Sequence, residues 1–111
     1  MKDISEVTDL MAELLENNVD CEANAFTKRG REIINEISDF AEQTRIFKDN
    51  KEKGDMFDDA TVVQLFGYML DRIVNAPTPI HRDMSVILIM PFVRRKLQEE
   101  ENQGNVQDNP E

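Results

Sequence analysis

The chain has 111 residues, of which 40% are hydrophobic and 32% charged, and its formal net charge is −10. This length accommodates one domain, and this balance is typical of a soluble folded protein rather than a disordered one. Strong negative charge disfavours nucleic acid as a partner for the surface as a whole, because binding to phosphates requires positive charge.

The longest run without a polar side chain covers residues 86–93. It is far shorter than the roughly 20 residues of a membrane-spanning helix. The N-terminus lacks the basic-then-apolar pattern of a secretion signal, and the single cysteine, Cys21, fits a reducing compartment. We therefore expect a cytoplasmic protein without membrane contact.

Apolar residues at helical spacing predict two amphipathic helices in the first half of the chain. From about Asp3 to Asn17 they follow an i, i+3, i+4, i+7 pattern, with acids on the opposite face. A longer helix is predicted from near Glu22 to Phe47, in which Gly30 marks either a break or a close approach between helices. The polar residues 48–55 are then expected to form a loop.

A third helix is predicted from roughly Asp58 to Asn75. Apolar residues cover more than half of its circumference, so we expect it to be central in the fold. One of Asp55, Asp58 and Asp59 is expected to cap its start, where the helix dipole favours negative charge.

The fourth predicted helix contains the apolar run. Thr78 as N-cap and Pro79 at the first helical position form its start signal. Residues 86–93, VILIMPFV, surround the helix axis, so this run is either enclosed by the other helices or meets another chain. Pro91 either kinks this helix or starts a separate one.

These elements predict an all-α fold, a compact bundle of four to five helices. Residues 1–101 are expected to form a single helical domain. The C-terminal segment 102–111 contains acids but no base and no aromatic anchor, and we expect it to form a disordered acidic tail.

Two pairs of acids resemble a magnesium site. Glu36-x-x-Asp39 and Asp55-x-x-Asp58 are similar to the helical acids of all-α nucleotide pyrophosphohydrolases, a resemblance that implies a Mg-dependent hydrolase. The pattern of that family is richer in glutamate, and the second pair here stands at a helix start. At about 100° per residue, Asp39 lies about 150° from the centre of the apolar stripe and should face solvent. The enzyme is therefore the second alternative, and we assign no catalytic, metal or cofactor-binding residue.

Two basic clusters are candidates for binding phosphate. They consist of Lys28, Arg29 and Arg31, and of Arg94, Arg95 and Lys96. If the fold brings the clusters together, they form a local basic patch, which makes a nucleic-acid-associated protein the first alternative. The second cluster has another use, because its side chains can form i, i+4 pairs with Glu99 and Glu100.

The leading hypothesis is a non-catalytic protein that binds another protein as a small acidic regulator, inhibitor or assembly factor. No catalytic set is present, the first helix is acidic, and the fourth helix has excess apolar surface. Small acidic helical proteins of this kind are frequent among phage and bacterial regulators. A protein that mimics the charge of nucleic acid is a special case of this hypothesis. A row of carboxylates on one face, beginning on the first helix, would indicate it.

The predicted partner surface lies on the fourth helix. It consists of Met90, Phe92, Val93, Arg94, Arg95 and Lys96. The apolar run 86–93 is also expected to support a homo-oligomer.

Overall fold

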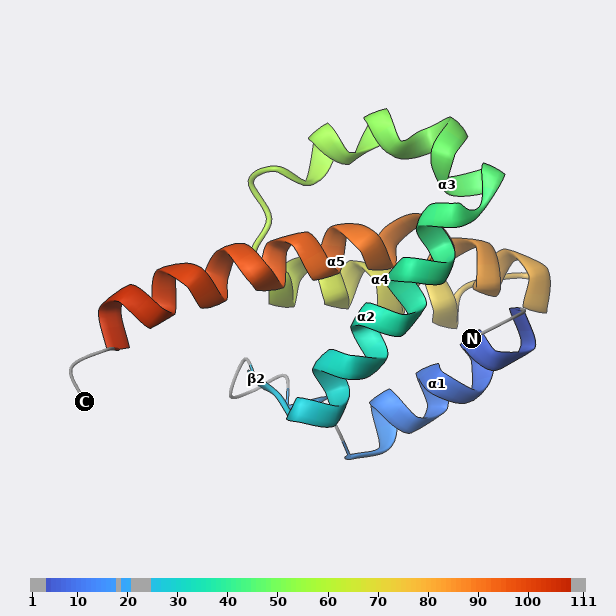
Figure 1. Ribbon diagram of the computed structural model, residues 1–111. Coiled ribbons are helices and arrows are strands. Elements are labelled where there is room, and N and C mark those ends of the chain that lie inside the picture. The colour runs from blue at the N-terminus through green and yellow to red at the C-terminus, as the bar shows by residue number, and fades with distance from the viewer. Residues whose placement is uncertain (1–3, 18, 21–24, 109–111) are drawn as a thin grey trace.

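The structure is a computed structural model that describes residues 4–17, 19–20 and 25–108, with side chains described for 5–16, 26–52 and 56–102. Helices make up most of it, so the predicted all-α fold with four to five helices is confirmed (Figure 1). The elements are α1 (Ile4–Asn17), β1 (Val19–Asp20), β2 (Ala25–Phe26), α2 (Lys28–Gln43), α3 (Arg45–Asn50), the 3₁₀ helix η1 (Lys51–Phe57), α4 (Val62–Val74) and α5 (Pro79–Asp108).

The two short strands form one antiparallel pair, with Val19 opposite Phe26. The tail predicted to be disordered, 102–111, overlaps the end of α5. Its side chains from residue 103 onward lie outside the described residues.

A threonine caps the start of each of the α-helices α2, α3, α4 and α5. In every case its side-chain oxygen accepts a hydrogen bond from the backbone N–H three residues later, at 3.0 to 3.2 Å. The four caps are Thr27, Thr44, Thr61 and Thr78, which recur every 17 residues. The predicted start of the fourth helix at Thr78 and Pro79 is thus confirmed. The prediction that an aspartate caps the third helix is wrong, because Thr61 forms a capping box with Gln64.

The long second helix predicted from Glu22 to Phe47 is wrong in its extent. The helix α2 begins only at Lys28, and the break falls at Thr44 rather than at Gly30, which is buried in the first turn. Thr44 has extended backbone angles, and its hydroxyl donates to the Ala41 carbonyl at 2.7 Å. One residue therefore ends α2 and starts α3.

The loop predicted over residues 48–55 is also wrong, since this segment is helical in α3 and η1. Aromatic side chains hold it at both ends. The ring centroids of Phe47 and Phe57 lie 5.4 and 5.5 Å from that of Phe92 in α5. Packing on α5 therefore orders a segment that is polar in sequence.

The central helix is α5, not the third predicted helix. It packs most extensively on α4 and α2, which lie behind and in front of it in Figure 1. Within α4, Phe66 and Met69 are buried, but Val74 at its end is 80% exposed.

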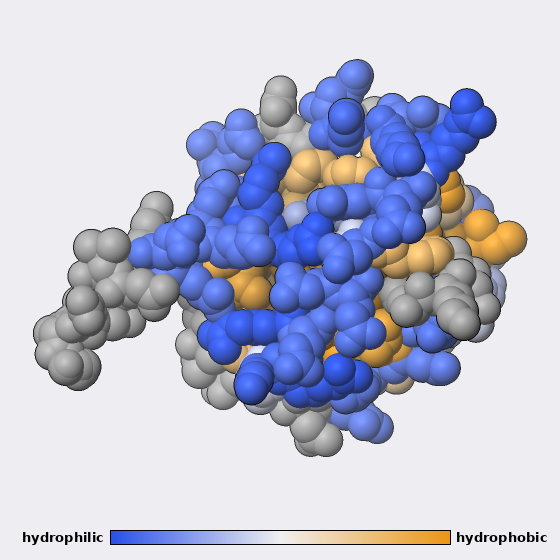
Figure 2. Space-filling view, in the orientation of Figure 1, coloured by the Kyte–Doolittle hydropathy of each residue, from blue (hydrophilic) through white to orange (hydrophobic). Residues whose placement is uncertain are grey.

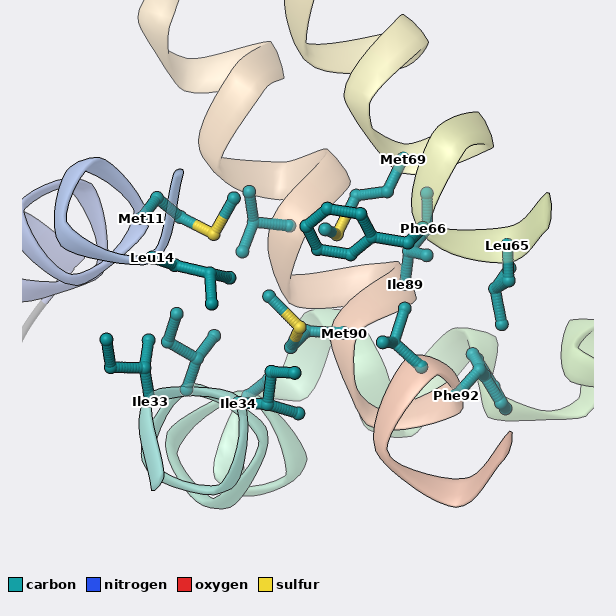
Figure 3. Close-up of a cluster of buried hydrophobic side chains, with 14 of the residues drawn as sticks. Met11, Leu14, Ile33, Ile34, Leu65, Phe66, Met69, Ile89, Met90 and Phe92 are labelled. Carbon is teal, nitrogen blue, oxygen red and sulfur yellow. The ribbon is translucent and has the colours of Figure 1, made fainter. Parts of the chain in front are cut away.

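The apolar run of α5 is enclosed by the chain's own helices except at Leu88, which is half-buried. Figure 3 shows Met90 in the middle of the buried cluster, between Ile34 of α2 and Phe66 of α4. Six hydrophobic side chains of the run are no more than 6% exposed, and these are Val86, Ile87, Ile89, Met90, Phe92 and Val93. Of the two expected arrangements, enclosure within one chain is the one observed.

Pro91 lies inside a single helix, because α5 runs without interruption from Pro79 to Asp108. Its ring leaves the Ile87 carbonyl without the usual N–H donor. The carbonyl of the preceding residue, Met90, has a partner in α2, because the fully buried Ser38 hydroxyl donates to it at 3.3 Å.

Candidate interaction site

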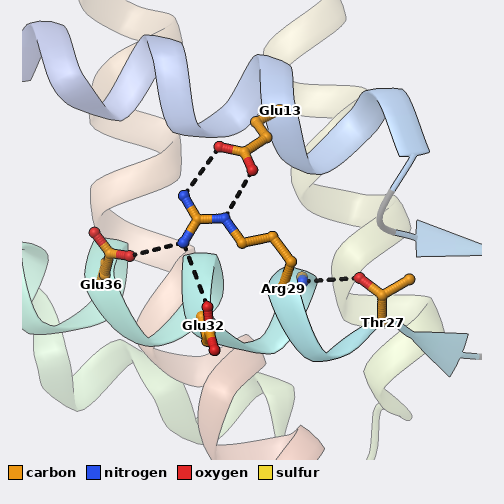
Figure 4. Close-up of polar contacts among 6 residues, drawn as sticks. Glu13, Thr27, Arg29, Glu32 and Glu36 are labelled. Atoms are coloured by element: carbon orange, nitrogen blue, oxygen red, sulfur yellow. Dashed lines mark hydrogen bonds and ion pairs between the residues drawn. The ribbon is translucent and has the colours of Figure 1, made fainter.

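The first basic cluster cross-links helices. Figure 4 shows the Arg29 guanidinium between α1 and α2. Its Nε and Nη2 donate to the two carboxylate oxygens of Glu13 at 2.7 and 3.0 Å, and Nη1 lies 3.3 Å from Glu36 and 3.5 Å from Glu32. The hydrogen bond from Arg29 holds the pKa of Glu13 below its ordinary value, and the same bond raises the pKa of Arg29. Arg31, on the same helix, pairs with Glu101 of α5.

In the second basic cluster, Arg94 joins α5 to α2. Its two Nη atoms donate to Asp39 at 2.7 Å and to Glu42 at 2.8 Å, and its side chain is only 17% exposed. Burial acts to lower the pKa of Arg94, but the hydrogen bonds to the two carboxylates outweigh it and raise the pKa. Both Nη atoms of this guanidinium are therefore already bound to carboxylates of the same chain.

The other two members of this cluster face the segment before α4. Arg95 lies 5.2 Å from the ring centroid of Phe92 and 3.9 Å from Asp58, and Lys96 donates to the Asp58 carbonyl. The predicted i, i+4 pairs do not appear among the described ion pairs, where Lys96 meets Glu99 instead. The carboxylate of Glu100 accepts from the first N–H of α4, that of Val62, at 2.8 Å.

Five of the six cations predicted to form a phosphate patch thus have carboxylate partners within the chain, namely Arg29, Arg31, Arg94, Arg95 and Lys96. A phosphate would have to displace those carboxylates. Lys28 is exposed, and no ion pair among the described residues includes it. The first cluster contacts α1 and the end of α5, whereas Arg94 contacts the later turns of α2, so the two clusters contact different partners.

The acids that resemble a magnesium site are also engaged. Glu36 contacts Arg29, Asp39 contacts Arg94 and is 69% exposed as predicted, and Asp58 faces Arg95. The side chain of Asp55 lies outside the described residues. Within the part of the chain whose side chains are described, no three His, Cys, Asp or Glu residues are placed to hold a metal ion.

The outer face of α2 carries a row of exposed acids, which are Glu32, Glu36, Asp39 and Glu42. The side of the molecule on which α2 crosses α5 is mainly hydrophilic (Figure 2). Two arginines, Arg29 and Arg94, are set into this row and partly neutralise it.

The predicted partner surface is not assembled as one exposed surface. Met90 and Val93 are fully buried and Phe92 is 6% exposed, because all three pack against the chain's own helices. Only Arg95 is exposed. Arg94, Arg95 and Phe92 do line a hollow of about 400 Å³, but both Nη atoms of Arg94 are already bound there.

Two large exposed apolar side chains lie elsewhere, between η1, α4 and the first half of α5. Met56 is 71% exposed and Tyr68 is 42% exposed. A first hollow of about 200 Å³ opens here, lined by Asn50, Met56, Phe57, Tyr68, Arg72, Ser85, Leu88, Ile89 and Phe92. A second of about 310 Å³ adjoins it, lined by Asp71, Arg72, Asn75, Ala76, Pro77, His81, Met84, Ser85 and Leu88.

We call the two hollows together the α4–α5 groove. The two share Arg72, Ser85 and Leu88. Of these three residues, the sequence analysis selected only Leu88, as a member of the apolar run 86–93, and Ile89 and Phe92 of the same run also reach the groove. The one local signal was Tyr68, the single tyrosine of the chain, which lies in α4 but is not among its buried residues.

Comparisons with protein-family models, with curated proteins and with solved structures find no match. Among the described helices, none is long and apolar enough to cross a membrane.

Proposed function

We propose that this chain is a non-catalytic acidic helical protein that acts by binding another protein, as a regulator, inhibitor or assembly factor. The observation that carries the proposal is a contrast between two kinds of side chain. Charged groups suited to phosphate or magnesium bind one another within the fold. Apolar groups at the α4–α5 groove remain accessible. We further propose that it acts in the cytoplasm, since a lone cysteine fits a reducing compartment.

Charge supports a protein partner over a nucleic acid. The chain carries a net charge of −10, and its two candidate basic clusters are largely neutralised by carboxylates. Loss of the condensed counterions around DNA or RNA favours binding only where a protein offers free cations.

The test is affinity capture of a partner. The tagged protein, incubated with lysate of its native cells, should retain one protein in stoichiometric amount, identified by mass spectrometry. Two activities would overturn the proposal. One is magnesium-dependent hydrolysis of nucleoside triphosphates that Glu36→Gln or Asp58→Asn abolishes. The other is salt-sensitive binding to DNA or RNA that Arg94→Ala with Arg95→Ala weakens. Repeated capture without any partner also contradicts it.

A further inference from the structure

We propose that the α4–α5 groove binds one amphipathic helix of a partner protein, with two large apolar side chains one turn apart and a carboxylate placed on Arg72. This inference rests on the proposed function and names the chemistry of the partner.

The groove has an apolar floor and an accessible rim. Ile89 and Phe92 lie at its base with 5% and 6% exposure, Leu88 is half-buried, and Met56 and Tyr68 project at the edge. Taken singly, the hollows of about 200 and 310 Å³ lie at or below the lower end of the roughly 300–1,000 Å³ typical of small-molecule sites. Side chains of a protein fit them better than a drug-sized ligand.

The spacing of the hollows matches one turn of helix. Along α5 the residues that line the first hollow fall between 85 and 92 and those that line the second fall between 81 and 88, an offset of four residues. Four residues of helix rise about 6 Å, and side chains at i and i+4 of a helix are separated by about 5–6 Å. A partner helix aligned with α5 therefore places one apolar side chain in each hollow, as in other helix-in-groove complexes.

Arg72 gives the groove its charge preference. It lines both hollows, with its guanidinium 6.0 Å from the ring centroid of Tyr68. No carboxylate in the described part of the chain forms an ion pair with Arg72, in contrast to Arg29 and Arg94. The carboxylate of Asp71, beside it, accepts instead from the Asn75 amide at 3.2 Å. A glutamate or aspartate on the partner helix complements this site, and a lysine opposes it.

The chain provides its own probe of the groove. Tyr68 is the only tyrosine and there is no tryptophan, so the intrinsic emission of the whole protein reports on this site. The probe ligand is a synthetic alanine-rich helical peptide without tyrosine or tryptophan, carrying two leucines four residues apart and one glutamate on the same face. A matched peptide has lysine in place of the glutamate.

We expect a saturable change in Tyr68 emission with the glutamate peptide and binding about tenfold weaker for the lysine peptide. The variant Arg72→Glu should reverse that preference, and Ser85→Phe, which fills the part common to both hollows, should abolish binding of both peptides. The variant Arg45→Glu changes an exposed cation outside the groove and should behave like the parent. Circular dichroism checks that each variant keeps its helix content.

Several results overturn the inference. These are no saturable change with either peptide up to about 1 mM, equal binding of both peptides, or an unreversed preference in Arg72→Glu. Tyr68 emission that depends on protein concentration without peptide would show that a second copy fills the groove instead. If affinity capture yields a partner that Arg72→Glu and Ser85→Phe retain, the proposed function stands and only the groove is wrong. If the parent captures no partner, the proposed function fails, whatever the peptides do.

Discussion

Arg29 and Arg94 each join carboxylates of α2 to a neighbouring helix. Arg29 brings Glu13 of α1 to Glu32 and Glu36, and Arg94 of α5 holds Asp39 and Glu42. Exposed ion pairs contribute only about 0–1 kcal/mol each, because water and salt screen them. Their greater effect is to define which faces of the helices meet, since a different crossing would leave these charges unpaired.

Glu13 makes the stability of this junction depend on pH. Its pKa is lower in the folded chain than its ordinary value because of the hydrogen bond from Arg29. Its ionised form therefore stabilises the fold above the ordinary glutamate pKa, and this contribution is lost as the pH falls through the folded pKa. Glu13→Gln should lower the urea midpoint at neutral pH, and the gap from the parent should close in acid.

Urea unfolding followed by circular dichroism at neutral and acidic pH measures that gap. Glu16→Gln, an exposed acid on the same helix, is the control and should leave the neutral midpoint close to that of the parent. A gap of equal size at both pH values would show that Glu13 does not act through its charge.

At the scale of elements, threonine hydroxyls determine where helices start. Thr44 serves two helices, because its oxygen accepts from the Phe47 N–H at 3.2 Å and its hydroxyl donates to the Ala41 carbonyl. It satisfies the open backbone groups of two helix ends at once. The turn between α2 and α3 depends on it, and so does the position of Phe47 against Phe92.

Thr44→Ala should therefore lower the free energy of unfolding by about 1–2 kcal/mol, the upper part of the usual range for an N-cap. Thr44→Ser keeps the hydroxyl and should stay much closer to the parent. Chemical denaturation of the three proteins measures the difference. Equal losses in the alanine and serine variants would mean that the methyl group, not the hydroxyl, is the important part.

The elements that sequence predicts well are those with a local signal. Val7, Met11 and Leu14 of α1 recur at helical spacing and are all buried, and Thr78 with Pro79 marks a helix start that the structure confirms. The break between α2 and α3 has no such signal, because Thr44 falls on the apolar stripe of α2 and continues its helical spacing, although its hydroxyl ends the helix.

The candidate site had no such local signal. Arg94 meets Asp39 across 55 positions of sequence and Arg31 meets Glu101 across 70, so neither pairing is visible before the helices are packed. The α4–α5 groove depends likewise on how three separate elements cross. Apolar spacing predicted that residues 86–93 needed cover, but it could not predict that the chain itself supplies that cover.

At the scale of the whole molecule, the core is organised around α5. Met90 is fully buried at its middle, among side chains of α2 and α4 (Figure 3). Met90→Ala should lower the free energy of unfolding by about 2–5 kcal/mol, the range for truncating a large buried side chain.

Ile80→Ala is the matched control, because Ile80 lies on the same helix and is 69% exposed. That variant should change stability by no more than about 0.5 kcal/mol. Urea unfolding measures both. If the two substitutions had similar effects, Met90 would not be in the core.

The position of α5 in the chain has a consequence for biosynthesis. The helices α2 and α4 pack mainly on α5, which is translated after both of them. A nascent chain that has emerged only as far as Val74 therefore exposes apolar side chains such as Ile34 and Phe66, which are buried in the finished protein. Isolated helices of this length are marginal in water. Folding thus waits until residues 86–97 leave the ribosome, and until then the earlier helices are open to chaperones and to aggregation.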